Sequence, residues 1–227
     1  MVQLAKVSVV IPVDQTDEYL TDAIESVVRQ STPPAEVIVV GEGLDIASEA
    51  LRPFGESVRA IRSKQSGIWG SCNLGITLSH GEYLAFLGPN DVWVADKLES
   101  QLAMLAAKPS IDVLLGHSSP LGTERTERDT GEREARGPSL RAGTMLLHRQ
   151  AFVRVGYFAT ERESGSFGDW LTRARAIGLN IDVAPGTVLL KRKVLETVGA
   201  PDSDGVESAS AAPISSADRE SDALGGE

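Results

Sequence analysis

The sequence predicts an α/β fold with a mostly parallel central sheet that is flanked by helices. Residues 7–13 and 37–40 are β-branched and almost wholly apolar, as expected of strands that are buried on both faces. Between them, apolar residues that include Leu20, Ile24 and Val27 recur at helical spacing. Strands and helices then alternate along the chain, an order typical of a parallel sheet with helices on both faces.

The remaining elements are predicted from apolar periodicity and from breaker residues. Pro33-Pro34 stops the first helix, Gly178 suits the end of the last helix, and Pro185-Gly186 separates the last two strands. The predicted strands are 7–13, 37–40, 58–61, 83–87, 111–115, 144–148, 181–184 and 188–190. The predicted helices are 17–30, 45–51, 68–79, 94–107, 150–155 and 169–177.

The chain is expected to form a single domain over residues 1–194, followed by a tail. Residues 118–138 mix acidic and basic side chains with almost no apolar ones, which predicts a flexible charged loop. A lid over a substrate is the alternative for this loop, because long loops are often functional. Residues 195–227 are rich in Ser, Ala, Asp and Gly, so we expect a disordered acidic tail.

Charge and cysteine content narrow the class of protein. The 227-residue chain has a formal net charge of −10, whereas nucleic acids and anionic membranes attract basic surfaces, so no nucleic-acid partner is expected. Its single cysteine cannot form an intramolecular disulfide, which suits a reducing compartment. No apolar run is long enough to cross a bilayer. We therefore expect a soluble, cytoplasmic protein without a membrane span.

The stretch over residues 81–93 combines a buried strand with a polar bend. The strand 83–87 is followed by Gly88, Pro89, Asn90 and Asp91. In open α/β sheets, ligands bind beyond the carboxyl ends of the strands. The bend is therefore the first place at which we expect a site.

Several motifs, in this order and spacing, resemble those of the family-2 glycosyltransferases, whose nucleotide-sugar domain has the GT-A fold. The resemblance covers roughly residues 5–193 and implies a GT-A, nucleotide-diphospho-sugar transferase-like domain of bacterial type. The matching segments are VSVVIPV at 7–13, YLTDAIESVVRQ at 19–30, VIVV at 37–40, CNLGI at 72–76, GEYLAFLGPNDVW at 81–93, KLESQ at 97–101, RVGYF at 154–158 and DWL at 169–171.

The resemblance also shows what has changed at the metal site. The family usually holds Mg²⁺ or Mn²⁺ on an Asp-x-Asp motif, which falls here on Gly88 and Asn90. Glycine offers no ligand atom and the asparagine carbonyl is neutral, whereas these hard cations prefer anionic oxygen. Asp91 is the remaining candidate metal ligand, although it could instead cap the helix predicted to follow. Mg²⁺ or Mn²⁺ would be usual for the family, but most of its ligands are missing here, so we do not expect a bound metal cofactor.

The nucleotide-binding positions implied by the resemblance are altered as well, and the family's Asp-Asp after the second strand falls here on Gly41 and Glu42. The candidates that remain are Pro12, Asp14, Glu42, Cys72, Asn90 and Asp91. Glu42 could accept a hydrogen bond from a base or ribose, or could be an ordinary solvated acid. Cys72 stands where the family has an arginine, and a packed small residue is the alternative to a reactive thiol.

The catalytic positions implied by the resemblance are also incomplete. The family's general base falls within residues 165–168, so the nearby carboxylates Asp169, Glu161 and Glu163 are the substitutes. Asp169 could instead cap a helix. Lys191 and Arg192 follow the last strand and could stabilise a departing diphosphate without a metal. A cationic strand end beside an acidic tail is the alternative.

Two functions remain open on these observations. The first is a pseudoenzyme: a family-2-like domain without ordinary metal-dependent sugar transfer, which serves as a binding module for a nucleotide-sugar or a protein partner. The second is an active inverting glycosyltransferase that uses a nucleotide-sugar donor at a metal-independent site.

Overall fold

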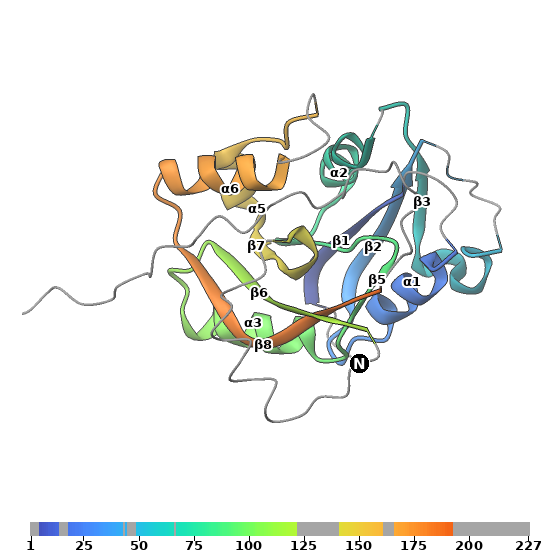
Figure 1. Cartoon of the computed structure of the whole chain (residues 1–227), viewed down its shortest axis with the longest axis horizontal. Coiled ribbons are helices and arrows are strands. Elements are labelled where there is room, and N and C mark those ends of the chain that lie inside the picture. Colours follow the sequence, from blue (N-terminus) through green and yellow to red (C-terminus); the bar gives the residue numbers. More distant parts are fainter. Residues whose placement is uncertain are drawn as a thin grey trace, which may run out of the picture.

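An eight-stranded sheet in the order β3-β2-β1-β4-β7-β6-β8-β5 forms the centre of the computed structural model (Figure 1). The structure describes residues 5–13, 18–42, 44, 49–65, 67–121, 141–160 and 166–192. The strands are β1 (Ala5–Val13), β2 (Pro34–Gly41), β3 (Arg59–Arg62), β4 (Tyr83–Phe86), β5 (Asp91–Trp93), β6 (Val113–Pro120), β7 (Leu146–His148) and β8 (Ile181–Lys191). The helices are α1 (Leu20–Val28), α2 (Gly67–Leu78), α3 (Lys97–Ala107), α5 (Arg149–Val155) and α6 (Ser166–Ala176), with short 3₁₀ turns η1 (Arg52–Ser57) and η2 (Ala142–Thr144).

The predicted α/β class is confirmed, and the sheet is mixed. Strands β3, β2, β1 and β4 are all parallel, and β6 is parallel to β8. Strand β7 is antiparallel to both β4 and β6, and β5 is antiparallel to β8. The parallel half brings the carboxyl ends of β1, β2, β3 and β4 to one edge, which we call the carboxyl edge.

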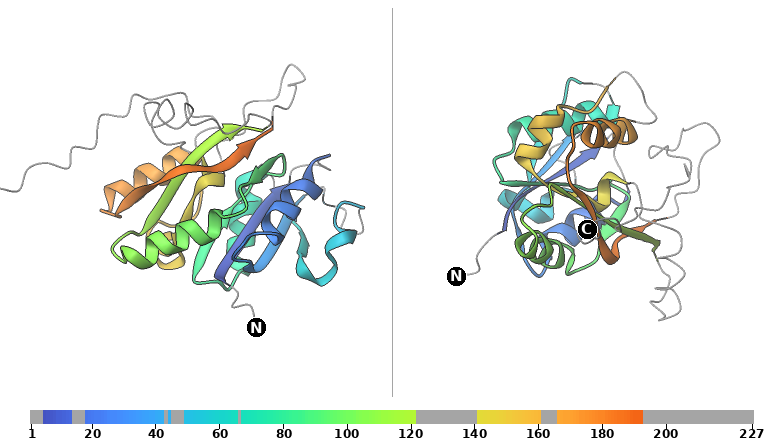
Figure 2. Two further views of the ribbon diagram at one scale, coloured as in Figure 1. Left: turned by 90° about the horizontal axis from the view of Figure 1, so that it is seen from below. Right: turned by 90° about the vertical axis from the view of Figure 1, so that its left-hand side faces the viewer.

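Helices cover both faces of the sheet, as the right-hand view of Figure 2 shows. One core lies under α1 and α3 and contains alternate residues of β1, for example Val9 and Ile11. The other core lies under α2, α5 and α6 and contains Val10 of the same strand. Because both faces of β1 are buried, its sequence is a continuous apolar run rather than an alternating one.

The chain differs from the prediction at several element boundaries. Pro185-Gly186 lies within one strand, β8, where Gly186 has φ +90°, so the two predicted late strands are one. Residues 118–120 belong to β6 and not to the predicted charged loop. The described residues end at 121 and resume at 141. Residues 49–51 form a turn rather than the end of a helix. Most of the charged loop and all of the tail lie outside the described residues.

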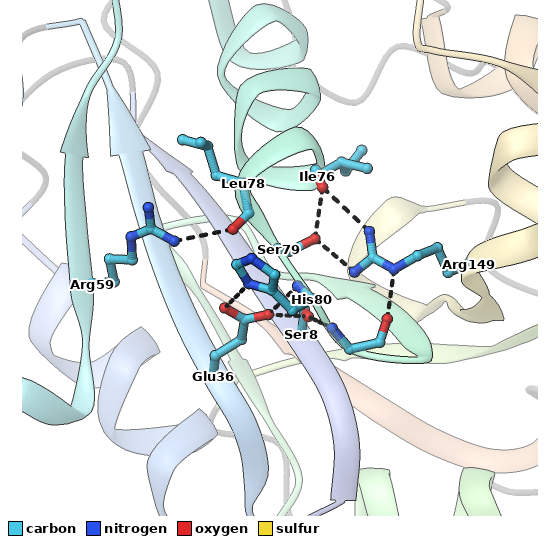
Figure 3. Close-up of polar contacts among 9 residues, drawn as sticks. Ser8, Glu36, Arg59, Ile76, Leu78, Ser79, His80 and Arg149 are labelled. Carbon is cyan, nitrogen blue, oxygen red and sulfur yellow. Dashed lines mark hydrogen bonds and ion pairs between the residues drawn. The ribbon is translucent and has the colours of Figure 1, made fainter.

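At the opposite, amino edge of the sheet, a partly buried polar network connects β1, β2 and α5 (Figure 3). Glu36 accepts hydrogen bonds from Ser8 Oγ at 2.6 Å and from the His80 backbone at 2.5 Å. Arg149 donates to Gly81 O at 2.6 Å and to Ser79 Oγ at 2.8 Å. Burial raises the pKa of Glu36. The hydrogen bonds from Ser8 and His80 lower it by more than burial raises it, so the net shift of the pKa is downward.

Within the described part of the chain, every helix is too short or too polar to cross a bilayer.

Candidate functional site at the carboxyl edge

The carboxyl edge brings together the ends of strands that are far apart in the sequence. Val13 pairs with Gly41, and Gly41 pairs with Arg62, so β1, β2 and β3 end in register. The Leu87 backbone donates to Val10 O at 3.1 Å, which carries the end of β4 alongside β1 and places the Gly88 bend at the same edge. The structure therefore positions the bend where the sequence predicts a site.

The bend itself closes tightly onto its carboxylate. The Asp91 backbone donates to Gly88 O at 3.2 Å, and a Cβ built on Gly88 would lie 3.6 Å from Asp91 Oδ2. Asp91 is the first residue of β5, while α3 begins six residues later at Lys97. The alternative in which Asp91 caps the following helix is therefore wrong. Asp96 occupies the N-cap position, without a side-chain hydrogen bond.

Asp91 has a cationic residue as its direct strand partner. In the antiparallel pair β5–β8, Asp91 is paired with Lys191. Residues directly opposite in such a pair lie on the same face, with Cβ atoms about 5 Å apart. The chain thus brings together two of the residues that the sequence singles out, from segments a hundred residues apart.

Arg192, the neighbour of Lys191, is bound to the start of α1. Its guanidinium group lies 4.0 Å from the centroid of the Tyr19 ring and donates to Asp22 Oδ2 at 2.6 Å. Its Nε is buried without a hydrogen-bond partner. Arg192 therefore joins β8 to α1, and ligand binding would have to displace these contacts. Sequence reasoning missed Tyr19 and Asp22 as its partners, because nothing in their local pattern indicates β8.

Gly41 and Glu42 differ sharply in the room available to them. A Cβ on Gly41 would overlap the carbonyl oxygen of Val13 in the neighbouring strand. Gly41 is therefore required by the close approach of β1 and β2 and has no space for the family's aspartate. Glu42 is exposed at the end of β2 and has no hydrogen bond or ion pair within the described structure. It remains available to a ligand.

Two other nucleotide candidates are packed into the fold. Pro12 is buried in β1, where it pairs with Val40. Cys72 is 1% exposed in the core under α2, and burial raises the pKa of its thiol. The packed alternative for Cys72 therefore fits the structure, and a thiolate does not. Asn90 is half-buried in the bend.

The base candidates are less well placed than the bend. Asp169 lies in the first turn of α6, where its carboxylate accepts a hydrogen bond from Arg173 Nε at 2.9 Å. The helix begins at Ser166, three residues earlier than predicted, so Asp169 does not occupy the cap position. Asp14, Glu161 and Glu163 lie outside the described residues.

The donor set at the bend does not fit a divalent cation. Gly88 contributes no side-chain atom, Asn90 contributes at most a neutral carbonyl, and Asp91 has Lys191 as its strand partner. In the described part of the chain, no three His, Cys, Asp or Glu side chains come together as a metal site. Mg²⁺ and Mn²⁺ favour anionic oxygens, which this bend supplies once.

A buried cation close to the bend escaped sequence reasoning. Lys97 is 0% exposed, its Nζ lies 4.2 Å from the centroid of the Trp93 ring, and it donates to Gln101 Oε1 at 2.7 Å. Burial lowers the pKa of Lys97 to about 7. The KLESQ segment places Lys97 and Gln101 one helical turn apart, but no sequence pattern indicates that this lysine is buried.

Comparisons with known proteins identify the family of this chain. The family model described as "Glycosyl transferase family 2" matches residues 8–165. A glycosyltransferase of Rickettsia bellii is 38% identical over 104 residues, which are 44% of this chain and 15% of that protein. This chain thus spans a small part of that relative. It also spans 46% of the putative teichuronic acid biosynthesis glycosyltransferase TuaG of Bacillus subtilis, to which it is 30% identical over 117 residues, 49% of this chain.

Solved structures share the fold at low sequence identity. Staphylococcus aureus TarS 1-349 in complex with UDP-GlcNAc is 17% identical with a TM-score of 0.69, over 83% of this chain and 58% of that one. The mannosyltransferase PcManGT from Pyrobaculum calidifontis, in complex with GDP-Man and Mn²⁺, is 17% identical with a TM-score of 0.66, over 87% of this chain and 59% of that one. These likenesses identify the GT-A fold.

Proposed function

The chain belongs to glycosyl transferase family 2, and on that premise we propose that its carboxyl edge binds a nucleotide-sugar without a divalent cation and without ordinary metal-dependent sugar transfer. The observation that carries this proposal is the pairing of Asp91 with Lys191 across β5 and β8. At the place of the family's metal, the chain has one carboxylate with a fixed ammonium group as its strand partner.

A fixed ammonium group changes what the bend can bind. A divalent ion would meet one carboxylate, and the nearby positive charge of Lys191 would repel it. A diphosphate, by contrast, is attracted by an ammonium group, because lysine binds phosphate as a point charge. The exposed carboxylate of Glu42 at the same edge can accept hydrogen bonds from a base or a ribose. These side chains suit a nucleotide diphosphate better than a metal ion.

Calorimetric titration with UDP-GlcNAc, GDP-mannose and a TDP-sugar tests this function, because TarS and PcManGT were solved with the first two ligands. Each titration is run in Mn²⁺ and again in EDTA. We expect binding of at least one donor with the same affinity in both conditions. We also expect no release of nucleoside diphosphate when the donor is incubated with the protein and Mn²⁺.

Matched lysine variants show whether binding occurs at the bend. Lys191→Met should weaken the affinity for the donor by about 10-fold, which corresponds to about 1.4 kcal/mol of binding free energy. Lys108→Met is the control, since Lys108 pairs with Asp182 on the exposed surface, and it should leave binding unchanged. Binding that requires Mn²⁺, or robust donor turnover in its presence, would refute the proposal.

A second candidate function is sugar transfer at a metal-independent site, and the position of Lys191 favours it. In such a reaction the bond from the sugar C1 to the diphosphate breaks while the acceptor oxygen bonds to C1 from the opposite face. The acceptor proton passes to a carboxylate, and Lys191 stabilises the departing diphosphate. Asp169 is the described candidate base, although its carboxylate already accepts a hydrogen bond from Arg173 Nε.

Donor hydrolysis in EDTA distinguishes this second function, since water can serve as the acceptor. If the site is active, Lys191→Ala should reduce the rate by about 10²-fold, a typical cost of removing a charge-stabilising group. Arg192→Ala should act mainly on stability, because Arg192 is bound to Asp22 and Tyr19. Full activity in Lys191→Ala would rule out this mechanism.

A further inference from the structure

Lys97 is a fully buried lysine whose contacts come from three separate parts of the fold. Its ammonium group lies over the Trp93 ring of β5 at 4.2 Å. It donates to Gln101 Oε1 of its own helix at 2.7 Å and lies 3.5 Å from Met145 O, after η2. No carboxylate within the described residues pairs with it. Burying such a charge is costly unless its partners compensate.

The same partners hold the turn η2 against β5. The Trp93 indole donates to Gly143 O at 2.9 Å, and Gln101 Nε2 donates to Thr144 O at 3.0 Å. Lys97, Trp93 and Gln101 thus connect α3, β5 and η2. The loss of the ammonium group would remove the contact that these elements share.

The arrangement extends directly to the bend. Side chains two residues apart on a strand share a face, so Asp91 and Trp93 lie on the same face of β5. Their partners on β8 are Lys191 and Leu189, and a Cβ on Gly143 would lie 3.1 Å from Leu189 Cδ2. The two rungs are therefore adjacent on one face of the β5–β8 ladder. The pair Trp93–Leu189 is supported by Lys97 and η2, and the pair Asp91–Lys191 is the charged pair at the bend.

We propose that Lys97 is a positioning residue for the carboxyl edge: through Trp93 it fixes β5 in the register that places Asp91 opposite Lys191. Lys97 does not contact a ligand in this role, and its effect on nucleotide-sugar binding rests on the function proposed above. Strand β5 is three residues long and pairs with β8 alone in the sheet order. Its position therefore depends on side-chain contacts more than that of a long central strand such as β1.

The test compares Lys97→Met with wild type by amide hydrogen exchange. Methionine nearly matches the volume of lysine, so the core stays filled while the charge and its donors are lost. We expect exchange at Trp93 and Val94 to rise at least 10-fold, exchange in β1 to stay the same, and the free energy of unfolding not to fall. A merely structural lysine would instead lower global stability and raise exchange throughout the sheet. Unchanged exchange at β5 in a folded variant would overturn the proposal.

Two further measurements separate this inference from the proposed function. If wild type binds a donor, Lys97→Met should weaken the affinity for that donor by about 10-fold. The same affinity in both proteins would also overturn the inference. If wild type binds no donor, the proposed function fails while the exchange comparison still decides the role of Lys97. Should Lys97→Met fail to fold, Trp93→Phe replaces it, because phenylalanine keeps a ring but loses the bond to Gly143. Wild-type exchange at Val94 in that variant would contradict the proposal.

Discussion

Asp91 and Lys191 lie directly opposite each other at the carboxyl edge, the first on β5 and the second on β8. A covalently fixed cation differs from a bound metal ion, because it cannot dissociate and it carries one positive charge instead of two. It can still offset part of the charge of a diphosphate. The proposed binding of a diphosphate without a metal ion therefore depends on this pair.

Restoring two carboxylates should restore metal binding. Gly88→Asp together with Asn90→Asp would rebuild the family's Asp-x-Asp beside Asp91. The bend has room for the first change, since the nearest atom to a Cβ at Gly88 is Asp91 Oδ2 at 3.6 Å and the backbone is not in the left-handed region. We expect the double variant to fold and to bind Mn²⁺ at least 10-fold more tightly than wild type in a calorimetric titration.

The single variant Asn90→Asp serves as the control and should bind Mn²⁺ less tightly than the double variant. Equal Mn²⁺ affinity in wild type and the double variant would show that the loss of these carboxylates is not what excludes the metal.

Gly41→Asp should behave in the opposite way, although it also restores a family residue. A Cβ at Gly41 would overlap the Val13 carbonyl, so β1 and β2 would have to separate where they pair. We expect a loss of about 1–3 kcal/mol in the free energy of unfolding, the usual cost of overpacking. Urea denaturation measures this loss. Glu42→Asp, on the adjacent exposed residue, should stay within about 0.5 kcal/mol of wild type, and equal losses in both variants would contradict the steric explanation.

Most of the fold could be predicted from local sequence patterns, and the exceptions share a physical cause. Strands β1 and β2 are long apolar runs, and α1 has a clear helical period, so short windows suffice to identify them. Strand β5 is different, since Asp91–Trp93 forms a strand through pairing with Leu189–Lys191. A three-residue strand whose partner lies about a hundred residues away has no local signal.

The site was predictable in location but not in its internal partners. Because parallel strands end at one edge, the sequence indicates that the Gly88 bend and Lys191 lie at that edge. It does not indicate that Arg192 is held by Tyr19 and Asp22, or that Lys97 is buried against Trp93. Those contacts depend on how helices pack over the sheet, which side-chain type alone does not specify.

Glu36 should contribute to stability at neutral pH and lose that contribution in acid. Hydrogen bonds from Ser8 and His80 hold its folded-state pKa below the ordinary value of 4.5. A lowered carboxyl pKa stabilises the fold above the unfolded pKa, and the effect disappears as pH falls through the folded pKa. We expect Glu36→Gln to cost about 1 kcal/mol at pH 7, because the amide oxygen can still accept both hydrogen bonds but lacks the charge that strengthens them.

Urea denaturation at pH 7, 4 and 3 measures this difference, which should shrink below about pH 4.5. Glu82→Gln is the control, because Glu82 forms an exposed ion pair with Lys6. It should have little effect at any pH. A Glu36→Gln deficit that stays constant down to pH 3 would show that the carboxylate charge is not the source of the stability.

Lys97 should make stability depend on pH in the alkaline range. Its folded-state pKa of about 7 lies below the ordinary 10.5, so the unfolded chain binds one more proton between these values. Stability therefore rises with pH across this window, and Lys97 adds no pH dependence below it, where both states are protonated. Relative to Lys97→Met, wild type should gain about 2 kcal/mol in the free energy of unfolding between pH 7 and pH 9, since a tenfold change in a protonation equilibrium corresponds to about 1.4 kcal/mol.

Urea denaturation at pH 7, 8 and 9 on both proteins measures this gain. The subtraction removes the titration of all other groups, and Lys108→Met should follow wild type at every pH. Parallel pH profiles for wild type and Lys97→Met would mean that the buried lysine keeps its proton throughout, held by Trp93 and Gln101 more strongly than burial disfavours it.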